Sequence, residues 1–155
     1  MPSSKNEKDQ KNSSKSQLEM KKVLVIEDNE DNMRLITFIL QKNGYNTIWA
    51  ENGRKGVELA DKEMPVFIVL DIQLPDIDGF EVLRLIRGSK ADGKVPIIAM
   101  TSYAMSGDRE KLLNGGCTGY IEKPINPETV MEEIHKITGS SSKGQGEKWA
   151  KDSET

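Results

Sequence analysis

The chain has 155 residues, 35% of them apolar, which suits one ordinary domain and excludes a large multidomain enzyme. Seven of the 22 basic and six of the 25 acidic residues lie in residues 1–20 and 139–155, which leaves 15 and 19, and a net charge of −4, in residues 21–138. An acidic domain lacks the clustered Lys and Arg that neutralise phosphates, so we expect no nucleic-acid partner.

Two polar ends flank the part of the chain that can fold. Residues 1–20 and 139–155 contain almost no side chain that could pack, so we expect a disordered arm, a folded domain over 21–138, and a disordered tail with Trp149 as an exposed aromatic. No stretch approaches the roughly 18 apolar residues that span a bilayer, and the start lacks a secretory signal. We therefore expect a cytoplasmic protein without membrane contact.

Between the ends, short apolar runs alternate with segments of helical spacing. This alternation is typical of an α/β fold in which a parallel sheet is covered by helices on both faces. Several runs are apolar at consecutive positions, as strands buried on both faces must be. The single cysteine, Cys117, is interpreted as a small buried hydrophobe. The predicted strands are residues 23–26, 45–49, 66–70, 95–100 and 119–121.

Five helices are predicted to follow the five strands. Asn29 precedes the first helix, Asn52 caps the second, the fourth begins near Ser106, and the fifth begins with Asn126 as its N-cap and Pro127 at its first position. The apolar positions predicted to face the sheet are Met33, Ile36, Ile39, Leu40, Val57, Ala60, Val82, Leu83, Ile86, Val130, Ile134 and Ile137.

Polar side chains stand where the predicted strands end. In an open parallel sheet the ligand site lies outside the carboxyl ends of the strands. Glu27 and Asp28 end the first strand, Asp71 the third and Thr101 the fourth, while the fifth leads to Lys123. The sequence therefore brings an acidic cluster, a hydroxyl and an ammonium group to one edge of the sheet.

The acidic cluster predicts a metal ion. An Asp after a strand is by itself more often a helix cap or turn former. Three carboxylates held together, however, repel by about 4 kcal/mol per contact at roughly 4 Å and an effective dielectric near 20. A fold that keeps Glu27, Asp28 and Asp71 together favours a hard divalent cation, and oxygen ligands of this kind suit Mg²⁺.

The same residues are parts for phosphoryl transfer. A metal ion and an ammonium group neutralise the charge of the transferred group, and a carboxylate can accept it. Asp71 is the predicted nucleophile because it follows the central apolar strand, between the acidic pair and Lys123.

Four segments resemble the response-regulator receiver domain, the CheY-like fold of two-component signalling. They are VLVIEDNEDN, VLDIQLPDIDGFEVL, PIIAMTSYAM and GYIEKPI, and the resemblance covers residues 22–138. It implies a flavodoxin-like sheet of strand order 2-1-3-4-5. The EDN start, the DIQLP segment and the expected lack of an output domain are most similar to stand-alone, single-domain receivers of the DivK type.

The resemblance implies a role for each strand-end residue. Asp71 would accept a phosphoryl group from a phosphohistidine on a sensor histidine kinase or a histidine phosphotransfer protein. Asp28 would bind Mg²⁺ directly and Glu27 through water, and the backbone carbonyl of Gln73 would complete the protein ligands. Lys123 would pair with the phosphoryl oxygens, and the peptide bond from Lys123 to Pro124 would be cis.

The resemblance also implies a switch. Phosphorylation adds nearly two negative charges, which would draw the Thr101 hydroxyl inward and vacate space for the Tyr120 ring. Tyr120 has an equally plausible interpretation as an ordinary half-buried strand aromatic. The expected output is a downstream effector protein that binds the face formed by the fourth helix, the fifth strand and the fifth helix. The chain is expected to be a monomer or a weak, phosphorylation-dependent dimer.

Three further residues keep open or ordinary interpretations. Gln73 and Tyr103 occupy positions that vary in the family and influence how fast the phosphoryl group is lost, and their effects stay open. His135, the only histidine, has no phosphodonor context and is interpreted as a surface or helix-end residue. The chain is thus expected to receive a phosphoryl group and not to be a turnover enzyme on a separate substrate.

Three rival functions are weaker. A haloacid dehalogenase-type phosphatase normally needs a second Asp two residues after the first, where this chain has Gln73, and it carries a cap domain. A nucleotide-binding protein would need a glycine-rich phosphate loop after the first strand, which is missing. The remaining alternative is a receiver-like interaction module that works without phosphorylation.

Overall fold

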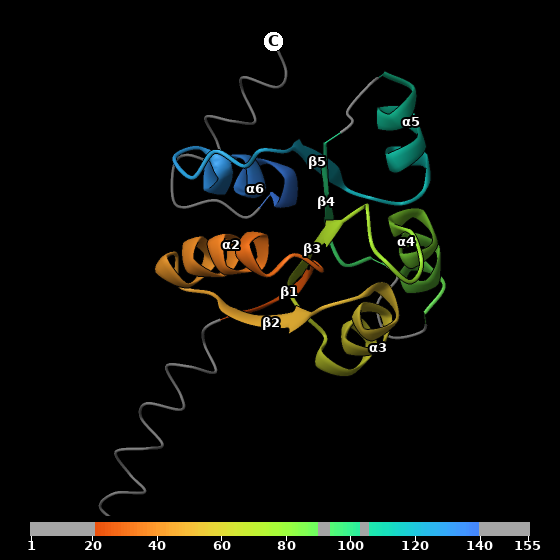
Figure 1. The fold of residues 1–155 in the computed structure, drawn as a ribbon, viewed down its shortest axis with the longest axis horizontal. Helices are drawn as coiled ribbons and strands as arrows, with labels where there is room; N and C mark the ends of the chain where they lie inside the picture. Colours follow the sequence, from red (N-terminus) through yellow and green to blue (C-terminus); the bar gives the residue numbers. More distant parts are fainter. Residues whose placement is uncertain (1–20, 90–93, 103–105, 140–155) are drawn as a thin grey trace, which may run out of the picture.

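The computed structural model describes residues 21–89, 94–102 and 106–139. The predictions for the arm, for residues 140–155 with Trp149, and for Tyr103 lie outside these residues. A five-stranded parallel sheet of order β2-β1-β3-β4-β5 forms the centre, as predicted (Figure 1). Its strands are β1 (Lys22–Ile26), β2 (Asn46–Ala50), β3 (Phe67–Asp71), β4 (Ile97–Thr101) and β5 (Gly119–Glu122).

Helices cover both faces of the sheet. In Figure 1, α2 and α6 lie on one side, and α3, α4 and α5 lie on the other. The helices are α2 (Glu30–Lys42), α3 (Gly53–Glu63), α4 (Gly79–Arg87), α5 (Ser106–Asn114) and α6 (Val130–Thr138). The predicted doubly wound α/β fold is therefore confirmed. Among the described residues, no helix is long and apolar enough to cross a bilayer.

Two apolar cores lie on the two faces of the sheet. Strands β3 and β4 are buried at every position, which is why their sequences are continuously apolar. One core joins the sheet to α3 and α4 and contains Cys117, whose burial raises the pKa of its thiol to about 11. The other core joins it to α2 and α6. Helix α3 can approach β1 closely because a Cβ on Gly56 would lie 2.5 Å from Ile26 Cδ1.

Strand boundaries differ from the predicted ones by one or two residues. β4 begins at Ile97 and not at Val95, because Pro96 has no N–H to donate to the sheet. The Pro96 carbonyl still accepts from the Ile68 amide at 2.9 Å. β5 continues through Glu122, which places Lys123 immediately after the strand.

The helix starts are confirmed at two of three predicted caps. The Asn29 and Asn52 side chains accept from the amides of Asn32 and Lys55 at 2.9 and 2.8 Å. The prediction for the last helix is wrong, because α6 begins at Val130 with Thr129 as its N-cap residue. The Asn126 side chain instead accepts from the Glu128 amide at 2.9 Å and forms a local turn before the helix.

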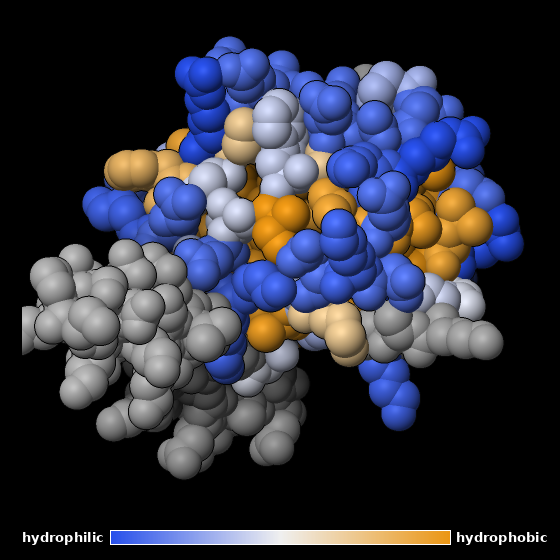
Figure 2. Space-filling model, turned by 90° about the horizontal axis from the view of Figure 1, so that it is seen from below, coloured by the Kyte–Doolittle hydropathy of each residue, from blue (hydrophilic) through white to orange (hydrophobic). Residues whose placement is uncertain are grey.

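The surface around the edge strand β2 carries several apolar side chains. Figure 2, seen from below relative to Figure 1, shows hydrophobic residues gathered between hydrophilic ones on this side. Five large hydrophobic side chains are exposed across the described residues as a whole, and not only beside β2: Phe38, Trp49, Met64, Val66 and Leu113. Trp49 lies on β2 itself, one residue before the strand ends.

Candidate functional site

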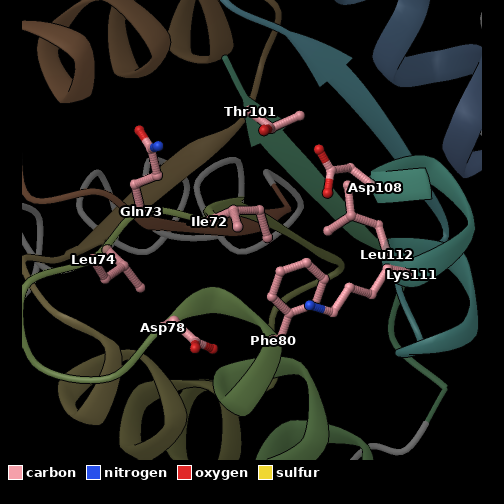
Figure 3. Close-up of a pocket in the computed structure, with 9 residues that line it drawn as sticks. All are labelled: Ile72, Gln73, Leu74, Asp78, Phe80, Thr101, Asp108, Lys111 and Leu112. Carbon is pink, nitrogen blue, oxygen red and sulfur yellow. The ribbon is translucent and has the colours of Figure 1, made fainter. Parts of the chain in front are cut away.

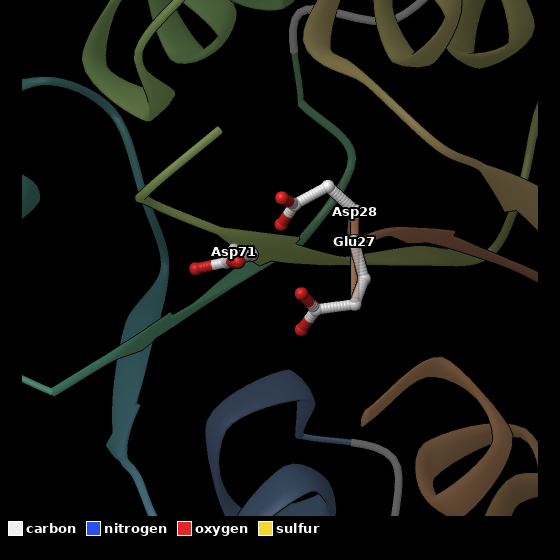
Figure 4. Close-up of side chains that lie close together, drawn as sticks. All are labelled: Glu27, Asp28 and Asp71. Atoms are coloured by element: carbon white, nitrogen blue, oxygen red, sulfur yellow. The ribbon is translucent and has the colours of Figure 1, made fainter. Parts of the chain in front are cut away.

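Three carboxylates meet at the carboxyl ends of the neighbouring strands β1 and β3. β1 and β3 pair in parallel with Ile26 opposite Leu70, so Glu27 follows one strand beside Asp71, the last residue of the other. One carboxylate oxygen each from Glu27, Asp28 and Asp71 lies within 4.8 Å of the other two (Figure 4). Glu27 and Asp71 are buried, whereas Asp28 is exposed and leaves the cluster open to solvent.

An ammonium group faces the cluster from the other side. Lys123 Nζ lies 3.1 Å from Asp71 Oδ1 and 3.6 Å from Glu27 Oε1. The lysine backbone amide donates to the Thr101 carbonyl at 2.8 Å, and the bond to Pro124 is cis, as the resemblance implied. Lys123 is mostly buried, so its charge acts on the two carboxylates with little screening by water.

Burial and the neighbouring carboxylate Asp71 both change the protonation of Glu27. Burial raises the pKa of Glu27 from 4.5 to about 7, and a hydrogen bond with Asp71 and the charge of Asp71 act in the same direction. The Asn29 amide, which donates to Glu27 Oε2 at 3.2 Å, and the Lys123 ammonium oppose this rise without cancelling it. The charge of Lys123 therefore does not neutralise all the negative charge of the three carboxylates, and a hard cation would neutralise the rest.

The loop after β3 fixes the orientation of Asp71. The Gln73 amide donates to Asp71 Oδ1 at 3.0 Å. Asp76, further along this loop, accepts from the Gly53 and Arg54 amides at 2.8 and 2.9 Å and thereby ties the loop to the start of α3. That the Gln73 carbonyl binds a metal ion stays a prediction.

Thr101 stands at the end of β4, beside Asp71. The register pairs Asp71 with Met100, so Thr101 is the next residue on the neighbouring strand. Its side chain is buried and lines a cavity of about 350 Å³ between the β3–α4 loop and α5 (Figure 3). Phe80 and Lys111, whose ammonium lies 4.7 Å from the centre of the Phe80 ring, line the same cavity.

Tyr120 lies on β5, two strands from Asp71, and is half-buried. The Arg109 guanidinium lies 5.6 Å from the centre of the Tyr120 ring and 3.9 Å from Glu122 Oε1. The ring thus packs between the sheet and α5. This placement fits both the switch and the ordinary strand aromatic, so the switch role stays a prediction.

The structure brings together six of the seven residues predicted for the site and places Tyr120 two strands away. The six are Glu27, Asp28, Asp71, Gln73, Thr101 and Lys123. The structure also adds contacts that were not predicted. Trp49 Nε1 donates to the Glu27 carbonyl at 2.7 Å, although the sequence analysis placed Trp49 only in a strand. Arg109 and Asp76 were not singled out either. A tryptophan at the end of an edge strand was the only sequence signal for the first contact. His135 lies in the last turn of α6, with its Nε2 3.3 Å from the Tyr45 hydroxyl.

The chain is similar in sequence to known response regulators. The profile of the response regulator receiver domain family matches residues 23–135. A polar-differentiation response regulator DivK from Brucella anthropi is 39% identical over 121 residues, which are 78% of this chain and 98% of that protein.

Solved structures of a response regulator and of a receiver domain share the fold of this chain. The chemotaxis response regulator CheY4 of Vibrio cholerae matches with a TM-score of 0.73 and 28% identity, over 76% of this chain and 98% of CheY4. The receiver domain of a Pseudomonas aeruginosa PAO1 sensor histidine kinase, solved with magnesium coordinated in its active site cleft, matches with a TM-score of 0.71 and 32% identity, over 78% and 99%. The chain therefore belongs to the response regulator receiver domain family of two-component signal transduction.

Proposed function

We propose that the chain accepts a phosphoryl group on Asp71 from a phosphohistidine of a sensor histidine kinase or phosphotransfer protein. The observation that carries the proposal is the 3.1 Å contact between Lys123 Nζ and Asp71 Oδ1 beside two further carboxylates. Its relatives of the DivK type are named as response regulators, which supports the same role here. The chain is then a phosphoacceptor and not a turnover enzyme on a separate substrate.

The transfer needs a nucleophile, charge neutralisation and a leaving group. A carboxylate oxygen of Asp71 attacks phosphorus, a P–O bond forms and the P–N bond of the phosphohistidine breaks. The imidazole nitrogen keeps the electron pair and takes up a proton. Lys123 already holds Asp71 by an ion pair and would exchange that contact for the phosphoryl oxygens. The Gln73 amide keeps the attacked carboxylate oriented.

The acidic cluster fits Mg²⁺ by its donor chemistry. Carboxylates from Asp28 and Asp71 would bind it, with Glu27 acting through water and the Gln73 carbonyl as a further ligand. Bound there, Mg²⁺ supplies positive charge to the equatorial oxygens of the transferred group. The Pseudomonas receiver domain that holds magnesium in its cleft supports this assignment.

The output would be a changed protein-binding face. The added charge on Asp71 would attract the Thr101 hydroxyl, and the movement of Thr101 would allow the Tyr120 ring to turn inward. The expected coupling of about 1 to 3 kcal/mol shifts a population between two states. An effector protein that reads the face formed by α5, β5 and α6 would complete the signal.

The proposal is tested by labelling with acetyl phosphate and Mg²⁺, followed by intact-mass measurement. The wild-type protein should gain the mass of one phosphoryl group, and Asp71→Asn should not. Asp78→Asn is the matched control, because Asp78 lies on the same loop and caps α4 outside the acidic cluster. Undiminished labelling of Asp71→Asn would place the acceptor elsewhere.

The alternative, a receiver-like interaction module that works without phosphorylation, gives a different result. Neither acetyl phosphate nor a phosphohistidine donor would label the wild-type protein. Asp71→Asn would then bind an effector as tightly as the wild type does.

A further inference from the structure

The Glu27 backbone is held by the edge strand β2 through two hydrogen bonds. Its amide donates to the Ala50 carbonyl at 3.0 Å, which continues the parallel ladder one residue past the end of β1. Its carbonyl accepts from the Trp49 indole Nε1 at 2.7 Å. Both polar groups of the Glu27 backbone are therefore paired with β2, one through backbone and one through a side chain.

The indole replaces a backbone donor that the strand no longer offers. β2 ends at Ala50, and the chain turns away to begin α3, whose N-cap is Asn52. A parallel ladder would satisfy the Glu27 carbonyl with an amide beyond Ala50, but the turn takes the backbone out of the ladder. Trp49 reaches across from β2 and donates in its place.

We infer that Trp49 is a positioning residue of the acidic cluster, acting through the backbone of Glu27. The carbonyl that it binds belongs to the peptide unit between Glu27 and Asp28, so the indole sets the direction in which the chain leaves β1. That direction decides where the Asp28 carboxylate stands relative to Asp71. This inference rests on the proposed function, because it concerns the residues proposed to bind Mg²⁺.

The location of Trp49 fits such a role better than a role in core packing. Ile48 and Ala50 of β2 belong to the core beneath α3 and α4, so Trp49 points to the other face of the sheet. It is 38% exposed, whereas Glu27 is 5% exposed. The indole thus forms a partly exposed rim over a buried backbone group, and its loss removes a hydrogen bond without opening either core.

The test compares Mg²⁺ affinity in three proteins by isothermal titration calorimetry at neutral pH. Trp49→Phe keeps an aromatic ring and removes only the donor. Because partners that hydrogen-bond to metal ligands typically change metal affinity by 10- to 100-fold, and Trp49 acts through the backbone and not on a ligand side chain, we expect binding about tenfold weaker than wild type. Phe38→Leu is the matched control, since Phe38 is an exposed aromatic of α2 with no contact to the acidic cluster among those observed, and should bind as the wild type does.

A purely structural role would lower the stability of the folded protein and leave the affinity of the folded fraction unchanged. Each titration is therefore run well below the melting temperature of its variant. A second measurement follows the Trp49 indole of the wild-type protein directly by NMR. In ¹⁵N-labelled protein, the Trp49 indole resonance, assigned by its absence in Trp49→Phe, should shift as Mg²⁺ is added.

The outcomes separate the two proposals. Equal Mg²⁺ affinity of Trp49→Phe and the wild type, with an indole resonance that does not move, would overturn the positioning role and leave the proposed function standing. Absence of Mg²⁺ binding from the wild type would overturn the proposed metal site and this inference together. Weaker binding in Phe38→Leu as well as Trp49→Phe would overturn the specific role of Trp49.

Discussion

Replacement of Glu27 by glutamine should remove the pH dependence that this buried carboxyl imposes on stability. The pKa of Glu27 is raised from 4.5 to about 7 by burial, by its hydrogen bond with Asp71 and by the Asp71 charge. The folded protein therefore holds this proton more tightly than the unfolded chain does. The resulting stabilisation is complete below about pH 4.5 and is lost as the pH rises through about 7.

The size of the effect follows from the two pKa values. A rise from 4.5 to about 7 corresponds to about 3 kcal/mol of unfolding free energy, lost between acid and neutral pH. For a domain of about this size, that free energy is roughly 10 °C in melting temperature. A glutamine at this position would keep the shape of the side chain without its titration, so the metal-free variant should gain stability over the wild type as the pH rises.

The assay is urea unfolding in EDTA at a series of pH values from about 4 to about 9. The difference in unfolding free energy between Glu27→Gln and the wild type should grow by about 3 kcal/mol over this range. Titrating groups with no contact to Glu27, such as His135, cancel in that difference. Glu110→Gln, a change at an exposed position of α5, should give a flat difference. A flat difference for Glu27→Gln too would refute the electrostatic description of the cluster.

Three further predictions concern the supports of the site. Lys123→Met should lower the metal-free unfolding free energy by about 2 to 3 kcal/mol near pH 8, because it leaves two buried carboxylates without their partner; an unchanged urea midpoint would contradict this. Gly56→Ala should lower the unfolding free energy by about 1 to 3 kcal/mol, because the added Cβ clashes with Ile26. The Cβ of Gly107→Ala has nothing within 4 Å, so this change should stabilise α5 by about 0.5 kcal/mol. Equal melting temperatures of the two variants would refute the close approach. Asp76→Ala should lower the unfolding free energy by about 1 kcal/mol, because two α3 amides lose their acceptor. An unchanged melting temperature would show that Asp76 does not hold the loop to α3.

Much of the fold follows from local patterns in the sequence. Continuous apolar runs predict buried parallel strands, and Asn29 and Asn52 mark helix starts because their side chains accept from amides three residues on. Asn126 misleads for the same physical reason. Its side chain satisfies an amide in a turn that precedes α6, and a cap and a turn look alike in sequence.

The candidate site is predictable as far as it depends on strand ends. Parallel strands bring their carboxyl ends to one edge, which is enough to group Glu27, Asp28, Asp71 and Lys123. The contact from Trp49 to the Glu27 carbonyl is different, because it depends on where β2 ends and on the direction of one side chain. Such contacts depend on how side chains pack in the folded protein, and the spacing of apolar residues in the sequence does not predict them.

The central claim is that Asp71 takes up a phosphoryl group beside a bound cation and Lys123. A crystal structure grown with Mg²⁺ and beryllofluoride tests it most directly. The account predicts beryllofluoride on a carboxylate oxygen of Asp71, in contact with Lys123 and Thr101, and one Mg²⁺ ligated by Asp28, Asp71 and the Gln73 carbonyl. Beryllofluoride on another carboxylate, or a Mg²⁺ bound away from Glu27, Asp28 and Asp71, would contradict it.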